Sequence, residues 1–538
     1  MRTWRLMNLQ LGLDEPESEL RARACTELAL DPGELRGFRV VSKSLDARRR
    51  RGIFRFVCHV ELILDRMTGA MKRAEKHGKL IAAAPRGSIE VESPLPHVAS
   101  GHAVVVGSGP GGLFAAYTLA RNGMRVTLID RGAALEQRGP RVVGFHRSRV
   151  PDPETNLLYG EGGAGTYSDG KLYTRVSHPL EVALLEVLVE CGAPPEILYD
   201  SRAHIGTDRL HRLLPRLRAR LEAAGVTFAW ETRLESLVLD GSVGDASRRV
   251  RAIRTSAGEI GCDSVVLAPG HSARDTWLAL HEQGVAFEPK PFQFGVRIEH
   301  PQTLITRGRF GDGPEAGLLG AAAYNLVCKP GDGLPGTHSF CMCPGGRIVA
   351  SVHEPGHLCT NGMSNATHSS RYANAALVTT FGPDEFGPGP FAGVEFQRHY
   401  EAAFFELGGS DYTAPAQRAT DFLAGRDSTG DLDTSYTFGA RPGRIDLALP
   451  PRARDALRRG LERFGGMIEH FAGPEGLLVG IETRSSGPVR MPRDRETHRA
   501  RGFANLYPIG EGAGSAGGIM SAALDGARCA QAICTTAP

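Results

Sequence analysis

Apolar and polar residues follow two different periodicities in the first part of the chain. In residues 17–30 the apolar side chains recur every three to four positions, which predicts an amphipathic helix. Residues 37–45 and 52–64 instead alternate at every second position, which predicts two antiparallel strands joined by a hairpin. A helix combined with a hairpin indicates a small α+β module over residues 1–95.

A different pattern begins after residue 101, where an apolar run meets a glycine-rich turn. The segment reads as strand, turn, helix and second strand, and Gly107, Gly109 and Gly112 form G-x-G-x-x-G. The first glycine allows a tight turn, the second lets backbone approach a pyrophosphate, and the third lets helix and strand pack closely. The helix N-terminus offers N–H groups to phosphates, and Asp130 offers a carboxylate to ribose hydroxyls. The predicted dinucleotide contacts here are Gly107, Ser108, Gly109, Gly111, Gly112, Asp130 and Arg131.

Alternation returns at residues 292–301, in a long region where we find no second glycine fingerprint. It predicts a strand in a mainly antiparallel sheet, whose polar side chains are candidate substrate contacts. We therefore expect a dinucleotide-binding domain over 101–287, interrupted by a substrate domain over 288–480 and completed by 481–538. A linker rich in Pro, Ser and Gly, within 92–102, follows the N-terminal module.

Composition limits the classes of protein to consider. With 538 residues the chain is too long for one ordinary core, and 41% hydrophobic and 23% charged residues are typical of a soluble globular protein. A net charge of +3 creates no global field that would favour nucleic acid or a membrane. The N-terminus lacks the apolar region of a signal peptide, and the ten cysteines are scattered without secretory features. We expect a soluble cytoplasmic protein with reduced thiols, and the sequence leaves its oligomeric state open.

Two further segments decide which dinucleotide is bound. Residues 208–271 read as a basic helix and short strands that end in Ala-Pro-Gly, an order that resembles the glutathione-reductase-like FAD fold. Residues 505–533 resemble the second flavin motif of that superfamily, in which Glu511 bonds the ribityl chain and a helix from Gly517 faces the flavin N1–C2=O edge. An enzyme that uses only NAD keeps its nucleotide motifs close together, so FAD is the predicted cofactor. These segments add Gly270, Gly510, Glu511, Gly517, Gly518 and Ile519 to the predicted contacts.

A third glycine-rich patch lies within residues 156–174 and follows the first mononucleotide unit. Relatives of glutathione reductase carry redox cysteines after such a patch, but this chain has Thr166, Tyr167 and Ser168 there. We therefore do not expect a dithiol mechanism. No dedicated NAD(P)H domain is visible, which leaves NADH or NADPH as a transient reductant. The patch adds Gly162, Gly163, Gly165 and Thr166 to the predicted contacts.

Together these segments resemble one family over nearly the whole chain. The motifs GEGGAGTYSDGKL, GHSARDT, KPFQFGVRIEHPQ, FCMCPGG and YPIGEGAGSAGGIMSAALDG are similar to the bacterial FAD-dependent dehydrogenases of the NAD(FAD)-utilizing type. The resemblance implies an α/β fold: a glutathione-reductase-like Rossmann FAD domain, an inserted mainly antiparallel substrate domain and a small N-terminal α+β module. It also implies an FAD-dependent oxidoreductase, but it does not identify the substrate. Ser515 and residues 485–488 depart from the family pattern on the expected substrate side.

Three residues are candidates for catalysis. His271 follows a parallel strand and is either a general base, a cofactor contact or part of a turn held by an Arg274–Asp275 pair. Lys171 either approaches the flavin, holds a substrate carboxylate or lies at the surface. Arg297 either binds an acidic substrate or forms an internal pair with a glutamate on its own strand.

Cys341 and Cys343 lie one residue apart before a Pro-Gly-Gly turn. On a strand they would face the same side with their Cα atoms about 6.6 Å apart, near the upper limit for a disulfide. Zinc would need further ligands, and the nearby histidines match no standard spacing. We therefore predict no metal site, and we expect both thiols to line the substrate pocket.

The leading hypothesis is an oxidoreductase that transfers a hydride between a small organic substrate and N5 of FAD. A flavin monooxygenase that activates oxygen at C4a has the same layout and remains an alternative. A second alternative is an RNA-modifying or non-redox flavoprotein, for which the basic run Arg48–Arg51 is the one supporting feature. We expect that run to be a solvated hairpin tip and expect no nucleic-acid partner.

Overall fold

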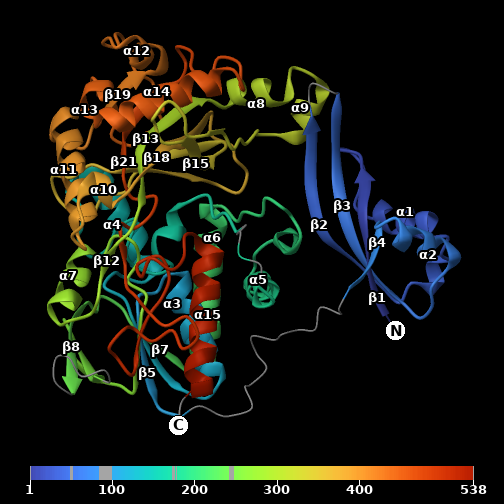
Figure 1. Ribbon diagram of the computed structural model, residues 1–538, viewed down its shortest axis with the longest axis horizontal. Coiled ribbons are helices and arrows are strands. Elements are labelled where there is room, and N and C mark those ends of the chain that lie inside the picture. Colours follow the sequence, from blue (N-terminus) through green and yellow to red (C-terminus); the bar gives the residue numbers. More distant parts are fainter. Residues whose placement is uncertain are drawn as a thin grey trace.

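The computed structural model arranges the chain around its three largest sheets, which Figure 1 shows as two stacked bodies and a module at one side. The structure describes residues 2–48, 52–83, 100–172, 176, 178–240 and 248–536.

The lower body contains a five-stranded sheet in the order β23-β11-β5-β6-β7, and all its pairings are parallel. Central strands β5 and β11 are buried along their whole length, as expected for strands covered on both faces. The predicted strand–turn–helix–strand unit is present as β5, α3 and β6. Bounds in this sheet are β5 (His102–Val106), β6 (Arg125–Ile129), β7 (Val226–Ala229), β11 (Ser264–Leu267) and β23 (Leu506–Pro508).

Two helices far apart in the sequence, α3 (Pro110–Arg121) and α15 (Ile519–Thr536), pack against each other beside this sheet. Their backbones are in contact, since a Cβ added at Gly526 would overlap the carbonyl oxygen of Gly111. Gly112 is equally confined, because its Cβ would overlap the carbonyl oxygen of Gly107. The third fingerprint glycine therefore serves close packing, as the sequence predicts.

The remaining elements of the lower body surround this sheet. A separate antiparallel sheet has the order β10-β9-β8, and β12 pairs with β22. Bounds are α4 (Leu135–Ser148), α5 (Leu180–Glu190), α6 (Thr207–Ala223), α7 (Arg274–Glu282), β8 (Leu234–Asp240), β9 (Arg249–Thr255), β10 (Gly258–Gly261), β12 (Glu288–Pro289) and β22 (Val489–Arg490).

The upper body is built on a seven-stranded sheet in the order β14-β15-β18-β13-β21-β19-β20. Its pairings are antiparallel except β19–β20, which is parallel. The strand predicted at 292–301 is β13, but both of its faces are buried, so its polar residues pair inside the protein. Bounds are β13 (Phe292–Pro301), β14 (Val327–Cys328), β15 (Thr337–Cys343), β18 (Tyr372–Phe381), β19 (Ala414–Arg418), β20 (Ala440–Pro442) and β21 (Leu477–Glu482).

Helices cover the upper sheet, and a short hairpin of β16 and β17 lies beside it. The helix bounds are α8 (Gln302–Phe310), α9 (Pro314–Leu319), α10 (Pro383–Phe386), α11 (Ala392–Leu407), α12 (Ala419–Ala424), α13 (Ile445–Ala448) and α14 (Pro451–Gly465). The hairpin strands are β16 (Gly346–Ala350) and β17 (Thr360–Ser364).

The N-terminal module is a four-stranded antiparallel sheet in the order β2-β3-β1-β4, with two helices on it. The predicted helix and hairpin are present, but the first strand, β1, was missed by the periodicity. The run Arg49–Arg51 and most of the predicted linker lie outside the described residues. Bounds are β1 (Arg2–Leu11), α1 (Glu19–Leu28), β2 (Gly37–Arg48), β3 (Ile53–Leu64), α2 (Gly69–Lys76) and β4 (Leu80–Ala83).

The long hairpin of this module contacts the rest of the protein. Lys43 N–H donates to the carbonyl of Tyr199 at 2.8 Å, and Ser201 N–H donates back to the carbonyl of Lys43 at 3.0 Å. Near the hairpin tip, Phe54 packs edge-on against Phe310 of α8, with ring centroids 6.4 Å apart. The module is therefore attached through its hairpin, as Figure 1 shows.

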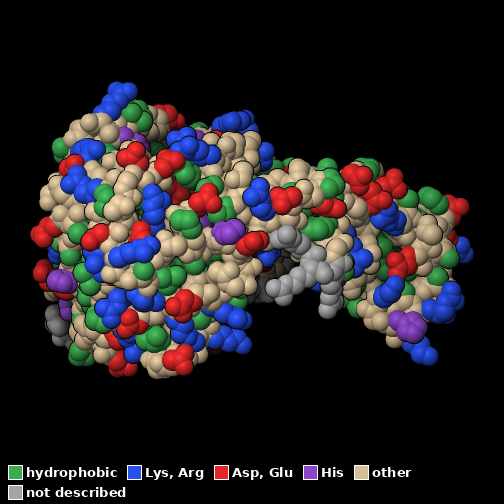
Figure 2. Space-filling model, turned by 90° about the horizontal axis from the view of Figure 1, so that it is seen from above, with side chains coloured by type: hydrophobic (Ala, Val, Ile, Leu, Met, Phe, Trp, Pro, Cys, Tyr) green, Lys and Arg blue, Asp and Glu red, His purple; other side chains and the backbone are tan. Residues whose placement is uncertain are grey.

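Acidic and basic side chains are mixed over the face seen in Figure 2, in keeping with the small net charge. None of the helices in the described ranges is long and apolar enough to cross a membrane.

The contact between α3 and α15 predicts a difference between two glycine substitutions. Gly526→Ala should lower the free energy of unfolding by about 1–3 kcal/mol, because the added methyl overlaps backbone. Gly144→Ala is the matched control in α4, where a Cβ meets nothing within 4 Å, and it should raise stability by up to about 1 kcal/mol. Chemical denaturation measures both, and equal effects would contradict the packing described here.

Candidate functional site

A cavity lies between the two bodies, at the carboxyl ends of the parallel strands. The residues after β5, β6, β11 and β23 all line it, and ligands of such sheets bind at this edge. The opposite wall comes from β15, β17 and the end of β21. The predicted cofactor contacts that line the cavity are Gly107, Gly109, Gly111, Asp130, Arg131, Gly163, Gly165, Gly270, Gly510, Glu511, Gly517, Gly518 and Ile519.

Bare backbone forms much of this wall, which fits a bulky dinucleotide. A Cβ at Gly109 would meet only the Cα of Gly163, at 4.0 Å, and a Cβ at Gly510 or Gly517 would meet nothing within 4 Å. These glycines therefore leave space that no protein atom fills. Space lined by the backbone N–H groups of helix starts suits a pyrophosphate. The residues present fit FAD.

The remaining predicted contacts lie behind this wall. They are Ser108, Gly112, Gly162 and Thr166, and none of them lines the cavity. Gly162 N–H donates to the carbonyl of Ser108 at 3.0 Å, and the Thr166 hydroxyl donates to the carbonyl of Glu161 at 3.0 Å. Their observed contacts support the loops that carry the lining glycines.

Asp130 organises these loops through its side chain. Its Oδ2 accepts hydrogen bonds from the Ser108 N–H at 2.8 Å and from the Ser108 hydroxyl at 2.6 Å. Its Oδ1 accepts from the N–H of Gly132 at 2.8 Å and of Gly160 at 3.1 Å. One carboxylate thus ties the fingerprint turn to the third glycine patch, a role that the sequence pattern did not indicate.

Arg138 supports the same patch from below and was missed by sequence reasoning. Its fully buried guanidinium donates to the carbonyl oxygens of Asn156, Glu161 and Gly163 at 2.9, 2.6 and 3.0 Å. Burial lowers the pKa of Arg138 to about 10, so it stays charged at neutral pH. The sequence offered one signal for this role: Arg138 lies on the same helix face as the apolar residues Leu135, Val142 and Phe145 of α4.

Lys171 lies at one end of the cavity, beside β15. Its ammonium donates to Asp169 Oδ2 at 2.6 Å and to the carbonyl of Met342. Asp169 also accepts from Ser364 and, at 3.2 Å, from His368. Burial opposes the charge of Asp169, but the hydrogen bonds from His368 and Lys171 hold its pKa well below the usual value. We call the part of the cavity that is lined by Asp169, Lys171, Cys341 and Cys343 the Lys171 end.

Cys341 and Cys343 both line the Lys171 end, and both are free thiols. Regular strand alternation does not hold here, because the β15–β18 register shifts between Phe340 and Cys343 and Cys341 has φ 42°. Cys341 is exposed and Cys343 is buried, so the two side chains are not equivalent. Burial raises the pKa of the Cys343 thiol, which leaves it protonated at neutral pH.

Arg297 is fully buried and does not line the cavity. The predicted internal pair exists, but not with the glutamate of its own strand: Arg297 Nη1 lies 2.7 Å from Glu482 Oε2. Glu299 is instead bonded by Thr434 and by Ser435. Arg297 also donates to the carbonyl of Cys341 at 2.9 Å, so it contacts cavity-wall residues from behind.

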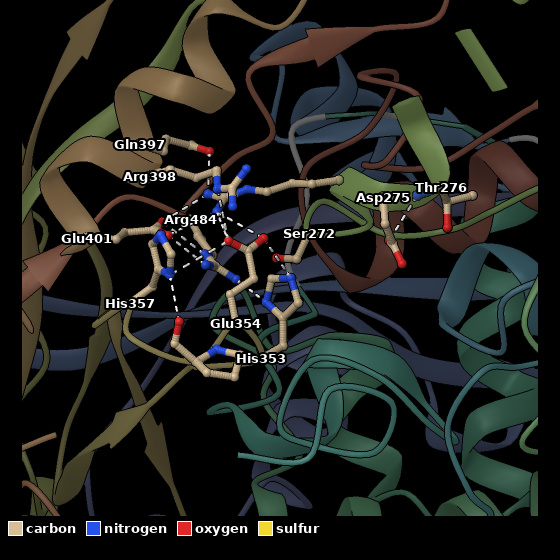
Figure 3. Close-up of polar contacts among 12 residues, drawn as sticks. Ser272, Asp275, Thr276, His353, Glu354, His357, Gln397, Arg398, Glu401 and Arg484 are labelled. Atoms are coloured by element: carbon tan, nitrogen blue, oxygen red, sulfur yellow. Dashed lines mark hydrogen bonds and ion pairs between the residues drawn. The ribbon is translucent and has the colours of Figure 1, made fainter. Parts of the chain in front are cut away.

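A second buried charge cluster joins α11 to the cavity wall (Figure 3). Glu401 is fully buried and accepts two hydrogen bonds at 2.9 Å from Arg274 and bonds of 3.0 and 2.7 Å from Arg484. The Arg274–Asp275 pair considered from the sequence is therefore wrong. Asp275 pairs with Arg131 at 2.8 Å instead.

His271 lines the cavity, and its Nδ1 lies 2.8 Å from the hydroxyl of Ser272. Burial, with a smaller effect of the Arg484 charge, lowers the pKa of His271 to about 4. The imidazole is therefore neutral at physiological pH and able to accept a proton. Glu511 also lines the cavity, and burial raises its pKa to about 7, partly offset by Lys290.

Among the described residues, no group of three or more His, Cys, Asp or Glu side chains is placed to hold a metal ion.

The cluster in Figure 3 predicts a large stability difference between two substitutions on α11. Glu401→Gln should lower the free energy of unfolding by about 3–5 kcal/mol, because it removes the buried carboxylate that Arg484 and Arg274 share and leaves Arg274 with only its longer ion pair, to Glu354. Glu406→Gln, at an exposed position of the same helix, should change it by less than about 0.5 kcal/mol. Denaturation curves measure both, and a Glu401→Gln protein of normal stability would refute the role of this cluster.

Three protein families match parts of the chain. The family described as FAD-dependent protein, C-terminal domain-like, matches residues 291–485. A domain of unknown function matches residues 4–62, and an NAD(P)-binding Rossmann-like domain matches residues 105–135.

One curated relative extends the likeness to the whole chain. An uncharacterized protein of Clostridium beijerinckii is 38% identical over 533 residues, which are 98% of each chain. Two solved structures are distantly similar. Glycine oxidase from Geobacillus kaustophilus is 12% identical over 81% of this chain and 95% of its own, with a TM-score of 0.34. L-proline dehydrogenase from P. horikoshii is 13% identical over 82% of this chain and 95% of its own, with a TM-score of 0.32.

Proposed function

The chain belongs to the same family as its clostridial relative, and because residues 291–485 match the family described as FAD-dependent protein, we propose an FAD-dependent oxidoreductase that transfers a hydride between a small organic substrate and the flavin. The observation that carries the proposal is the glycine-lined cavity at the carboxyl ends of four parallel strands. When bound, FAD supplies a ring system that accepts two electrons and a proton as a hydride equivalent.

Residues of the lower body have separate roles in this proposal. Gly109, Gly163 and Gly517 bring backbone to the dinucleotide, and Asp130 holds the loops that carry two of them. His271 accepts the proton that an alcohol or amine group loses as its carbon gives up a hydride.

The substrate side of the site is the Lys171 end, where the upper body forms the wall. Asp169 and Met342 hold the Lys171 ammonium in place there, and its charge faces a cavity lined by thiol and amide side chains. NADH or NADPH enters this proposal only as a transient reductant, because the sequence has no second G-x-G-x-x-G with the flanking strand and acidic residue of a dinucleotide-binding unit. The small organic substrate reacts at this end of the cavity.

The direct test is the colour and redox behaviour of the purified protein. It should be yellow, release FAD on denaturation, and be reduced anaerobically by one or more members of a metabolite panel that includes NADH and NADPH. A colourless protein that cannot be reconstituted with FAD would end the proposal. Stopped-flow detection of a flavin hydroperoxide would favour the monooxygenase alternative instead.

A substitution at Gly109 separates cofactor binding from folding. Gly109→Val should keep the melting temperature of the FAD-free protein within a few degrees but abolish FAD binding, because its Cβ projects into the cavity without overlapping the protein. Gly144→Val, at an exposed helix position with open space around it, is the control and should bind FAD normally. Flavin absorbance per protein and thermal melting measure the two effects, and a yellow Gly109→Val protein would contradict the assigned site.

The neutral state of His271 predicts the pH dependence of flavin reduction. The contribution of His271 to this rate, taken as the ratio of wild type to His271→Asn, should stay level from about pH 5 to 8 and fall near pH 4, since below its pKa the imidazole is protonated and cannot accept a proton. His271→Asn should slow reduction by about 10²–10⁴-fold, whereas His399→Asn at an exposed position should not change it. Anaerobic stopped-flow absorbance measures both, and an unchanged rate in His271→Asn would remove the histidine from the reaction.

A further inference from the structure

The wall at the Lys171 end has three hydrogen-bond acceptors that are held from behind by one buried arginine. Arg297 donates to the carbonyl of Cys341 at 2.9 Å, to Oδ1 of Asn361 at 3.3 Å and to Oε2 of Glu482 at 2.7 Å. All three acceptor residues line the cavity, but Arg297 does not. A guanidinium only donates, so each of these oxygens is committed to the protein side of the wall.

The same contact fixes the orientation of the Asn361 amide. Its Oδ1 accepts from Arg297 and, at 2.7 Å, from the N–H of Gly362, so its NH₂ group lies on the other side. Within the described part of the chain the amide nitrogen has no protein partner. Asn361 is half-buried in the cavity wall, so it presents two N–H donors there.

Lys171 adds a charged donor to the same wall. Two of its three N–H groups are used, by Asp169 and by the carbonyl of Met342. Met342 follows Cys341, whose carbonyl Arg297 holds, so both cations support one short segment of β15. The third N–H of Lys171 has no protein partner in the described ranges, and Lys171 lines the cavity.

The carboxylates at this end are already engaged. Glu482 Oε1 accepts from the Ser485 hydroxyl at 2.8 Å, and its other oxygen accepts from Arg297. Asp169 accepts from Lys171 through one oxygen and from Ser364 and His368 through the other. A ligand at this end therefore meets donors without partners and acceptors that already have them.

We infer that the Lys171 end binds a carboxylate group of the substrate, with Lys171 and the Asn361 amide as its donors. This inference rests on the proposed function and adds the substrate class. A carboxylate has two oxygens that accept several hydrogen bonds, and the lysine charge strengthens them. Arg297 is a positioning residue, because it orients the Asn361 amide and occupies the oxygen atoms of Cys341 and Glu482 that would otherwise face the ligand. The exposed side chains of Phe340 and Cys341 offer apolar contact to the rest of the molecule.

The test compares benzoate with benzamide, which have the same shape but differ in charge. Each is titrated into the FAD-loaded protein, and the change in flavin absorbance gives a dissociation constant. Benzoate should bind saturably, and benzamide should bind at least about tenfold more weakly. Lys171→Met and Asn361→Asp should each raise the benzoate dissociation constant by about tenfold or more at unchanged FAD content. Lys171→Met removes the cation, and Asn361→Asp replaces a donor by a negative charge.

Asn365→Asp is the matched control, because it makes the same chemical change at an exposed position outside this cavity. It should leave benzoate affinity unchanged. Arg297→Lys keeps the buried charge but loses the planar guanidinium that donates to Asn361 and Glu482 at once. It should weaken benzoate binding while FAD affinity is retained. A purely structural role for Arg297 would instead lower the melting temperature without changing the benzoate dissociation constant.

Equal binding of benzamide and benzoate, or normal benzoate binding by Asn361→Asp, would overturn the inference. Its failure is distinguishable from failure of the proposed function. If benzoate binds as expected but no substrate reduces the flavin, the oxidoreductase proposal fails and the carboxylate site stands. If a substrate without a carboxylate reduces the flavin and benzoate does not bind, the carboxylate site fails and the oxidoreductase proposal stands.

Discussion

The carboxylate of Asp130 holds together the loops on which the cavity depends. A wall of bare backbone cannot support itself, because these turns form few regular hydrogen bonds of their own and buried N–H groups need partners. Asp130 supplies acceptors to Ser108, Gly132 and Gly160, and Arg138 supplies donors to the carbonyl groups below the same patch. A buried anion above and a buried cation below thus keep a side-chain-free surface open for the dinucleotide.

The opposite wall follows the same principle with arginines at its centre. Arg297 and Arg484 are both buried, and each is paired with a glutamate, Glu482 and Glu401 respectively. Unpaired, such charges would be costly to bury; paired and bonded to wall residues, they give the upper body a defined surface toward the cavity. The lower body therefore supplies the dinucleotide surface, and the upper body supplies polar groups whose orientation is set from behind.

Much of the lower body was predictable because its signals are local. The fingerprint glycines, the buried strand before them and the acid after the second strand lie within one short segment, and the structure places most of the predicted contacts on one cavity. Strand β1 was missed by the periodicity. Cys341 and Cys343 do not lie on one face as they would in a regular strand, because the β15–β18 register shifts between Phe340 and Cys343. Bulges of this kind leave no periodic mark in the sequence.

By itself the sequence determined the dinucleotide fingerprint, the buried parallel strands and the absence of redox cysteines at the third glycine patch, since each depends on neighbouring residues. Only the tertiary structure decided the partners of the buried charges. Arg297 meets Glu482, 185 residues away, instead of the glutamate on its own strand, and Arg274 meets Glu401 instead of Asp275. Pairing is decided by which side chains the packed sheets bring within hydrogen-bond distance, and no spacing along the chain encodes that.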